Sequence, residues 1–238
     1  MALADAPPPY RTLVFDCDST LAAMEGIEAL ASPSQAEEIA RLTDAAMDGT
    51  VPLEEVFGRR LELLRPGRSD VERIGRLYVE RRLRNVDALV ATARALGKRV
   101  IVVSGGLLPA VRALARHLDV EEVHAVGVTF DEAGAYAGFD EDSRLARAGG
   151  KIDVLEKILE DEGARPLAFV GDGATDLEAG HLADRFVAFG GVLRREAVFR
   201  AAAVRCASAD FAALAPLLFS PAELASAPPE LSPPPTDP

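Results

Sequence analysis

Four short apolar runs, each followed by a helical pattern, constrain the fold of this chain more than any other feature. Each run is bounded by polar residues or glycine, and the helical pattern follows at once or after an insertion. Near-continuous apolar strands that alternate with helices are typical of a parallel α/β sheet covered on both faces. We therefore predict such a core, with strands at TLVF (12–15), RVIVVS (99–104), LAFV (167–170) and FVAF (186–189).

A long helical insertion follows the first apolar run. From Glu25 to about Asp87 the apolar spacing is helical throughout, and capping-box pairs occur at Ser34–Glu37 and Ser69–Glu72. This pattern predicts a small helical cap that is inserted after the first strand and lies over the edge of the sheet. The predicted domains are the cap at 25–87 and the core at 11–24 and 88–220.

The remaining segments are assigned from composition and turn signals. VHAVGVTF (123–130) followed by GAYAGF (134–139) predicts a two-strand hairpin carried on the core. Three consecutive prolines predict an extended lead-in at 1–10, and the proline-rich segment 221–238 is interpreted as a disordered tail.

Bulk composition excludes several classes of protein. The formal net charge of −12, the pI of about 4.8 and the 5% aromatic content argue against a nucleic-acid-binding surface. There is no apolar run of about 18 residues and no secretory signal pattern, so we expect no membrane partner. The two cysteines form neither a disulfide framework nor a zinc motif, which indicates a reducing, cytoplasmic compartment.

The first predicted strand ends in two aspartates, Asp16 and Asp18. Because side chains alternate along a strand, both carboxylates point the same way, toward the crevice where ligands of parallel sheets bind. Two anions this close repel each other unless a cation lies between them or one is protonated, and Mg²⁺ suits such oxygen ligands. Taken alone, the pair is explained more simply as a surface Asp-x-Asp turn.

Two further strand ends carry groups suited to phosphate and metal. Ser104, Gly105 and Gly106 offer a hydroxyl and closely approachable N–H groups for an anion, with a helix beginning near Pro109. Asp172 in GDG offers another metal ligand. An ordinary strand-to-helix turn remains the alternative for the first group.

The neighbouring helices add Asp176, Thr175 and Lys151. Thr175 has capping-box spacing to Glu178, which favours a structural role at a helix start. Lys151 occupies a first helical turn, where the macrodipole disfavours a cation, so a nearby phosphate or aspartate cluster would explain it. A solvated surface lysine is the simpler alternative.

In combination, these motifs resemble the haloacid dehalogenase superfamily of phosphatases. Its four motifs correspond to DCDST, SGG, the lysine of GGK, and GDGATD, and the resemblance covers roughly residues 11–215. It implies a Rossmann-like core with an inserted cap. Within the superfamily, FDCDSTLAAMEGIEALA, AMDGTVPLEEVFGRRLELL and GDGATDLEAG are similar to the phosphoserine phosphatase family, although Leu53 and Leu107 stand where that family usually has phenylalanine.

The resemblance implies a role for each matching residue. Asp16 would be the nucleophile and Asp18 the general acid and base, with Mg²⁺ bound by Asp16, the backbone carbonyl of Asp18, and Asp172. Asp176 would support Lys151 or the metal waters from outside the ligand shell, with Thr175 beside it. The residues implied to bind the phosphoryl group are Ser104, Gly105, Gly106, Lys151 and Thr175.

The resemblance also implies recognition of the amino acid. Glu25 would pair with the substrate ammonium, Arg60 would fork onto its carboxylate, and Met47 and Leu53 would supply apolar walls. The implied activity is hydrolysis of O-phospho-L-serine to serine and phosphate through an aspartyl-phosphate, the last step of serine biosynthesis, by a monomer or homodimer. Transfer to an alcohol such as homoserine, another small phosphomonoester as substrate, and a non-catalytic binding protein are the alternatives.

Overall fold

The computed structural model describes residues 7–47 and 53–231, and its core is a six-stranded sheet in the order β3-β2-β1-β6-β7-β8. All of its strand pairs are parallel, which confirms the predicted α/β class. The strands are β1 (Thr12–Phe15), β2 (Arg99–Leu107), β3 (Glu122–Val126), β6 (Leu167–Gly171), β7 (Arg185–Phe189) and β8 (Val204–Cys206).

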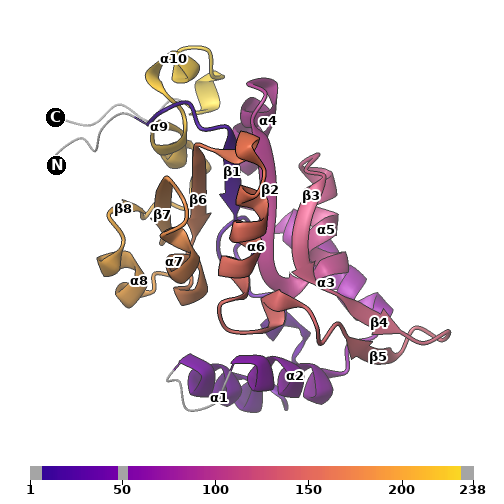
Figure 1. Ribbon diagram of the computed structural model, residues 1–238. Coiled ribbons are helices and arrows are strands. Elements are labelled where there is room, and N and C mark those ends of the chain that lie inside the picture. Colours follow the sequence, from indigo (N-terminus) through magenta and orange to yellow (C-terminus); the bar gives the residue numbers. More distant parts are fainter. Residues whose placement is uncertain (1–6, 48–52, 232–238) are drawn as a thin grey trace.

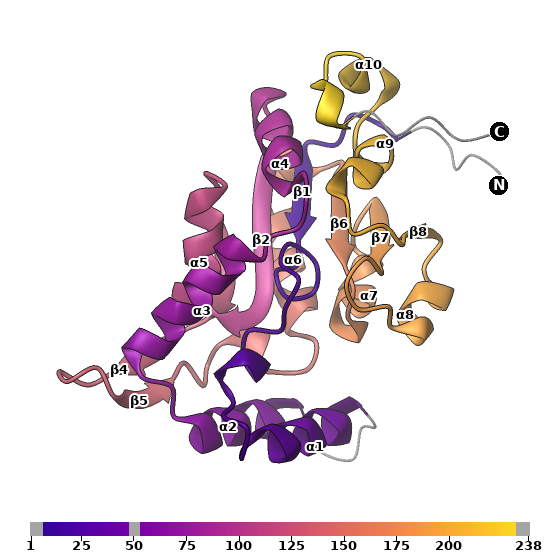
Figure 2. The ribbon, with the colours of Figure 1, turned by 180° about the vertical axis from the view of Figure 1, so that it is seen from behind.

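Helices cover both faces of this sheet. The strand order reverses after β3, and right-handed crossovers therefore place helices of the two halves on opposite faces. Figures 1 and 2 show α6 on one face and α4 on the other. The helices around the sheet are α4 (Val86–Ala95), α5 (Leu108–His117), α6 (Gly150–Leu159), α7 (Ala174–Gly180), α8 (Glu196–Ala201) and α9 (Ala215–Leu218).

The central strand β1 and its register with β2 and β6 determine where these three strands end relative to one another. β1 is fully buried and lies between β2 and β6, so its residues have no solvent-facing side. Phe15 is opposite Val102 on one side and Val170 on the other. The residues that follow Phe15, Val102 and Val170 therefore emerge at one level, at the carboxyl edge of the sheet.

The predicted cap range contains α1 (Ala36–Met47), α2 (Leu53–Leu64) and α3 (Arg68–Glu80). Figure 1 shows α1 and α2 beyond the carboxyl edge of the sheet, beside the hairpin of β4 (Val128–Phe130) and β5 (Tyr136–Phe139). In contrast, α3 runs along α5, with Gly75 close to Ala110 and Ala113. The boundaries of the cap, including the assignment of α3 to it, stay a prediction.

Three sequence interpretations differ from the structure. The predicted hairpin starts only after Gly127, because 122–126 pairs with β2 as an edge strand of the main sheet. The short strand β8 was not predicted. The N-cap of α3 is Gly67, whose N–H donates to Asp70 Oδ2 at 3.0 Å, so Ser69–Glu72 is not the capping box of this helix. A glycine N-cap has no side-chain oxygen, and the spacing rule therefore missed it.

The predicted disordered tail is wrong for residues up to 231. Helix α10 (Pro221–Leu224) is capped by Ser220 and Glu223, and Leu231 of the turn η5 (Pro229–Leu231) is fully buried. Lys98 Nζ donates to Glu223 Oε1 at 2.5 Å and to the Tyr10 carbonyl at 2.7 Å. Proline composition misled the prediction, because a proline at the first position of a helix needs no N–H donor. Residues 232–238 lie outside the described part of the chain.

Within 7–47 and 53–231, helices long and apolar enough to cross a membrane are absent.

Candidate active site

Side chains from three neighbouring strands meet at the carboxyl edge of the sheet. Asp16 follows β1, Ser104 lies near the end of β2, and Asp172 follows β6. All three are buried, with 6%, 0% and 3% of their surface exposed. Because the strands are in register at this level, residues between 68 and 156 positions apart in the chain converge on one crevice. This is where ligands bind in open parallel sheets.

Lys151 is the cation of this cluster. Its ammonium contacts Asp176 Oδ1 at 2.6 Å and Asp16 Oδ1 at 2.9 Å, and its side chain is 8% exposed. Burial alone lowers the pKa of Lys151, but the charges of Asp16 and Asp176 outweigh it and hold the pKa above the ordinary value. The carboxylates therefore explain why a lysine begins α6, as the sequence interpretation required.

Gly150 allows α6 to begin here. A Cβ at Gly150 would overlap the Arg144 carbonyl of the turn η2 (Arg144–Ala146), and the preceding Gly149 has a φ of 72°. A side chain at either position would push the start of α6 away from the sheet or strain its backbone. The two glycines of GGK thus set the position from which Lys151 reaches Asp16.

Three carboxylates offer ligand atoms for a metal ion. Oxygens of Asp16, Asp172 and Asp176 lie within 4.8 Å of one another, and all three residues are buried. Burial, followed by repulsion from Asp176, raises the pKa of Asp172 to about 6, and burial raises the pKa of Asp16 well above its ordinary value. The two cations that contact these three buried carboxylates, Lys151 and Arg195, do not balance their charge, so this oxygen cluster fits a hard divalent cation.

The cluster contains one carboxylate, that of Asp176, in addition to those of the predicted ligands Asp16 and Asp172. Asp176 was predicted to act from outside the ligand shell, but its carboxylate belongs to the cluster while also bonding Lys151 and accepting the Gly173 N–H at 2.8 Å. The carboxylate of Asp18 is directed elsewhere. Its backbone carbonyl as a ligand stays a prediction. The role predicted for Asp176, outside the ligand shell, therefore stays a prediction, and the same carboxylate also caps the start of α7.

The carboxyl group of Asp18 accepts two hydrogen bonds, both on the same oxygen. Its Oδ1 accepts the Tyr78 hydroxyl at 2.6 Å and the Gly26 N–H at 2.7 Å. Burial raises its pKa to about 7, and the nearby Glu25 acts in the same direction. A carboxyl group with such a pKa is partly protonated at neutral pH, as a general acid must be.

The Ser104–Gly106 segment, in the last part of β2, lies directly beside Asp18. The Gly106 N–H donates to Ser104 Oγ at 2.9 Å, and a Cβ at Gly106 would lie 3.1 Å from Asp18 Oδ2. Helix α5 begins two residues later, with Pro109 in its first turn, as predicted. The absence of a side chain at Gly106 thus allows the backbone of this segment to approach the Asp18 carboxylate closely.

The predicted amino-acid pocket is brought together only in part. Glu25 Oε1 accepts the Ser19 hydroxyl at 2.6 Å, and the desolvated Arg60 guanidinium lies in the field of Glu28, Glu25 and Asp18, which partly offset the lowering of its pKa by burial. The side chains of Met47 and Leu53 lie outside the described part of the structure. Thr175 is half-buried in the first turn of α7, whose N-cap is Gly173.

Sequence reasoning missed Arg195, which enters the site from the loop after β7. Its Nε lies 3.2 Å from Asp172 Oδ2, and its Nη2 lies 3.5 Å from Glu25 Oε1. It therefore links the carboxylate cluster to the predicted amino-acid pocket. The sequence did offer one indication of this region. FVAF is a predicted strand of the same parallel sheet, so the segment that follows it should also lie at the carboxyl edge, where ligands bind.

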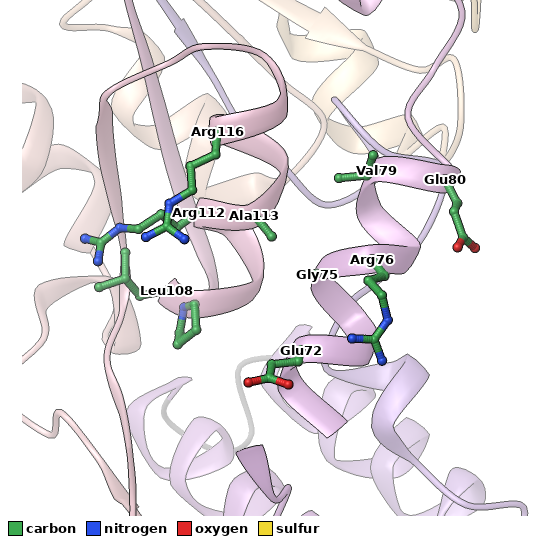
Figure 3. Close-up of a pocket in the computed structure, with 10 residues that line it drawn as sticks. Glu72, Gly75, Arg76, Val79, Glu80, Leu108, Arg112, Ala113 and Arg116 are labelled. Atoms are coloured by element: carbon green, nitrogen blue, oxygen red, sulfur yellow. The ribbon is translucent and has the colours of Figure 1, made fainter. Parts of the chain in front are cut away.

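A groove between α3 and α5 lies outside this site (Figure 3). Its described lining includes Glu72, Arg76, Leu108, Arg112 and Arg116, and none of the predicted site residues is among the lining residues. Arg76 therefore provides a matched control for substitutions of Arg60.

Comparisons with known proteins agree with this geometry. The family model for haloacid dehalogenase-like hydrolases matches residues 13–181. Phosphoserine phosphatase of Bos taurus is 35% identical over 187 residues, which are 77% of this chain and 83% of that protein. The chloroplastic phosphoserine phosphatase of Arabidopsis thaliana is 37% identical over 193 residues, 79% of this chain and 65% of the relative, slightly less than two thirds of its length.

A solved structure, a phospho-aspartyl intermediate analogue of phosphoserine phosphatase, matches with a TM-score of 0.72 and 25% identity over 87% of this chain and 98% of that one.

Proposed function

The chain belongs to the phosphoserine phosphatases of the haloacid dehalogenase-like hydrolase family, and from this membership we propose that it hydrolyses O-phospho-L-serine to serine and phosphate. The proposal rests on one observation above all. Asp16 lies at the end of the central strand with Lys151 at 2.9 Å, and a carboxyl group with a pKa of about 7 follows two residues later. This arrangement provides a nucleophile, a charge partner and an acid within one crevice.

In the proposed mechanism, a carboxylate oxygen of Asp16 attacks phosphorus. A bond forms between this oxygen and phosphorus while the bond to the serine oxygen breaks, and the carboxyl proton of Asp18 passes to the leaving oxygen. Water then attacks the phosphorus, Asp18 takes up a proton from that water, and the bond to Asp16 breaks. Phosphate leaves, and both aspartates return to their starting states.

Other residues would hold the phosphoryl oxygens during both steps. We assign this role to the Ser104 hydroxyl, the N–H groups of Gly105 and Gly106, and the Lys151 ammonium, with Thr175 nearby. Lys151 is suited to it because two carboxylates already fix its ammonium, at 2.6 and 2.9 Å, so little reorganisation is needed. Asp176 positions Lys151 from the other side.

A divalent metal, which we propose to be Mg²⁺, would be held by Asp16, Asp172, the backbone carbonyl of Asp18 and, directly or through water, Asp176. When bound, it supplies positive charge that offsets the repulsion between nucleophile and phosphoryl group. The buried carboxylate cluster supports this assignment.

For the amino-acid part of the substrate, we propose that Glu25 binds the ammonium group and Arg60 the carboxylate, between apolar walls from Met47 and Leu53. The position of Arg60 in the field of Glu25 and Asp18 supports this proposal. We also propose a cytoplasmic, reducing location, supported by Cys17 and Cys206, which are both free.

Phosphate release from a panel of monoesters tests this function. The purified protein is incubated, with and without Mg²⁺, with L-phosphoserine, phosphothreonine, phosphoethanolamine and a sugar phosphate. We expect Mg²⁺-dependent release with a strong preference for L-phosphoserine. Release from the other esters but not from phosphoserine would contradict the substrate assignment, and serine formation without free phosphate when homoserine is added would favour a phosphotransferase.

Replacing Arg60 by Ala is expected to raise KM for phosphoserine by roughly 10- to 100-fold, the scale of a lost charged hydrogen bond. KM for p-nitrophenyl phosphate, which has no carboxylate, should change less than about threefold. Steady-state kinetics with both substrates measures this difference. Arg76→Ala, in the groove between α3 and α5, is the matched control. An equal rise in KM for both substrates would remove Arg60 from carboxylate recognition.

A further inference from the structure

We infer that Tyr78 is a positioning residue that selects which oxygen of Asp18 delivers the proton to the leaving group. This inference rests on the proposed function and adds a residue to it that no motif contains. Tyr78 is fully buried, and it lies on the apolar face of α3 with Val71, Ile74 and Gly75. Its ring fills the core, but its hydroxyl reaches the active site.

The Tyr78 hydroxyl has a defined acceptor. It donates to Asp18 Oδ1 at 2.6 Å, a short and well-formed O–H···O hydrogen bond. Burying a tyrosine hydroxyl without a partner is costly, and so is burying a carboxylate without donors. Each group therefore stabilises the other in this position.

Gly26 donates a second hydrogen bond to Asp18, and its lack of a side chain leaves space for the Tyr78 hydroxyl. Its N–H donates to the same Oδ1 at 2.7 Å, and a Cβ at this position would overlap the Tyr78 hydroxyl. A glycine is needed here because the tyrosine approaches the backbone closely, although the φ of this residue is not in the left-handed region. Tyr78 and Gly26 thus form a matched pair around one carboxylate oxygen.

The pair leaves Oδ2 as the oxygen that carries the proton. Both donors point at Oδ1, so a proton on Asp18 is directed to the other oxygen. Oδ2 faces the Ser104–Gly106 segment, to which we assign phosphoryl binding, since a Cβ at Gly106 would lie 3.1 Å from it. The proton is therefore held on the side where the leaving oxygen would be, and it passes from Oδ2 to that oxygen as the bond to phosphorus breaks.

Backbone hydrogen bonds fix Tyr78 relative to the catalytic loop. The Ala23 N–H donates to the Arg81 carbonyl at 2.9 Å, and the Leu83 N–H donates to the Leu21 carbonyl at 3.0 Å. The end of α3 is thus tied to the residues that follow Asp18. A hydroxyl on such a rigid support orients its acceptor better than one on a mobile loop.

Leaving-group dependence tests this role. Protonation of the leaving oxygen matters greatly for serine, a poor leaving group, and little for p-nitrophenolate, a good one. We expect Tyr78→Phe to lower kcat for phosphoserine on the order of 10- to 100-fold with little change in KM, and to lower kcat for p-nitrophenyl phosphate less than about threefold. Tyr10→Phe, an equally buried tyrosine at the far end of β1, should behave as wild type.

Two further variants make the outcome decisive. Gly26→Ala displaces the Tyr78 hydroxyl while leaving the tyrosine in place, and it should show the same leaving-group dependence. If Tyr78→Phe fails to fold, Gly26→Ala alone tests the positioning role of Tyr78. If Tyr78→Phe and Gly26→Ala each lower kcat equally for phosphoserine and for p-nitrophenyl phosphate, the inference is overturned. If Asp18→Asn itself shows no leaving-group dependence, the acid role assigned under the proposed function fails instead, so the two failures are distinguishable.

Discussion

Replacing Asp16 by Asn is expected to abolish phosphate release, with kcat falling on the order of 10⁵-fold or more, the scale seen when an enzyme loses its nucleophile. An amide oxygen has no negative charge to attack phosphorus and forms no stable acyl phosphate. The neighbouring charges remain paired, because Lys151 keeps its 2.6 Å contact with Asp176. The loss should therefore lie in chemistry and not in folding.

The stability of Asp16→Asn gives a second, independent expectation. Burial raises the pKa of Asp16 well above its ordinary value, so the ionised group destabilises the folded state at neutral pH. Removing this charge in metal-free buffer should leave the melting temperature equal to or higher than that of wild type. Thermal unfolding measured beside the phosphate assay checks both points, with the exposed Asp142→Asn as control. Residual activity within tenfold of wild type would require another nucleophile.

The sequence predicted the parts of this site that lie at strand ends. Asp16, Ser104 and Asp172 follow apolar runs, and register brings such positions together in a parallel sheet. The lysine of GGK was identifiable because a cation at a helix start is unfavourable without an anionic neighbour. These inferences succeed because strand periodicity and the helix dipole act over a few residues of chain.

Other parts of the site depend on tertiary packing, and the local sequence does not single out the residues involved. Tyr78 looks like any apolar-face residue of α3, and only the arrangement of α3 against the core directs its hydroxyl to Asp18, 60 positions away. Arg195 is one of two adjacent arginines, and nothing in the local sequence distinguishes the one that reaches Asp172. The anchored segment around Glu223 was missed because its partner, Lys98, is 125 positions away.

Lys151→Met is expected to destabilise the protein by about 3–5 kcal/mol at pH 8, the range for removing one partner of a buried ion pair. The side chain of Lys151 is 8% exposed, and those of its partners Asp16 and Asp176 are 9% and 1% exposed, so solvent compensates little for the lost cation. Urea denaturation in buffer with chelator measures the difference. Lys157→Met, on an exposed position of the same helix, should change stability by less than about 0.5 kcal/mol.

The pH dependence of this loss identifies its cause. The folded-state pKa values of Asp18 and Asp172, about 7 and about 6, lie above their ordinary value of 3.8. The folded state therefore binds more protons than the unfolded state between about pH 4 and pH 7, and stability falls as the pH rises through this window. Lys151 lowers the pKa of both groups and of Asp16, so its removal makes this fall steeper.

The stability difference between wild type and Lys151→Met should consequently be larger at pH 8 than at pH 5, where the buried carboxylates are more fully protonated. Titration of Lys151 itself does not contribute, because its pKa is raised from an ordinary value of 10.5 and the ammonium stays charged across this range. A difference that is the same at both pH values would mean that lost packing, and not unpaired carboxylates, destabilises the variant. The role of Lys151 as the charge that holds this acidic cluster together would then be wrong.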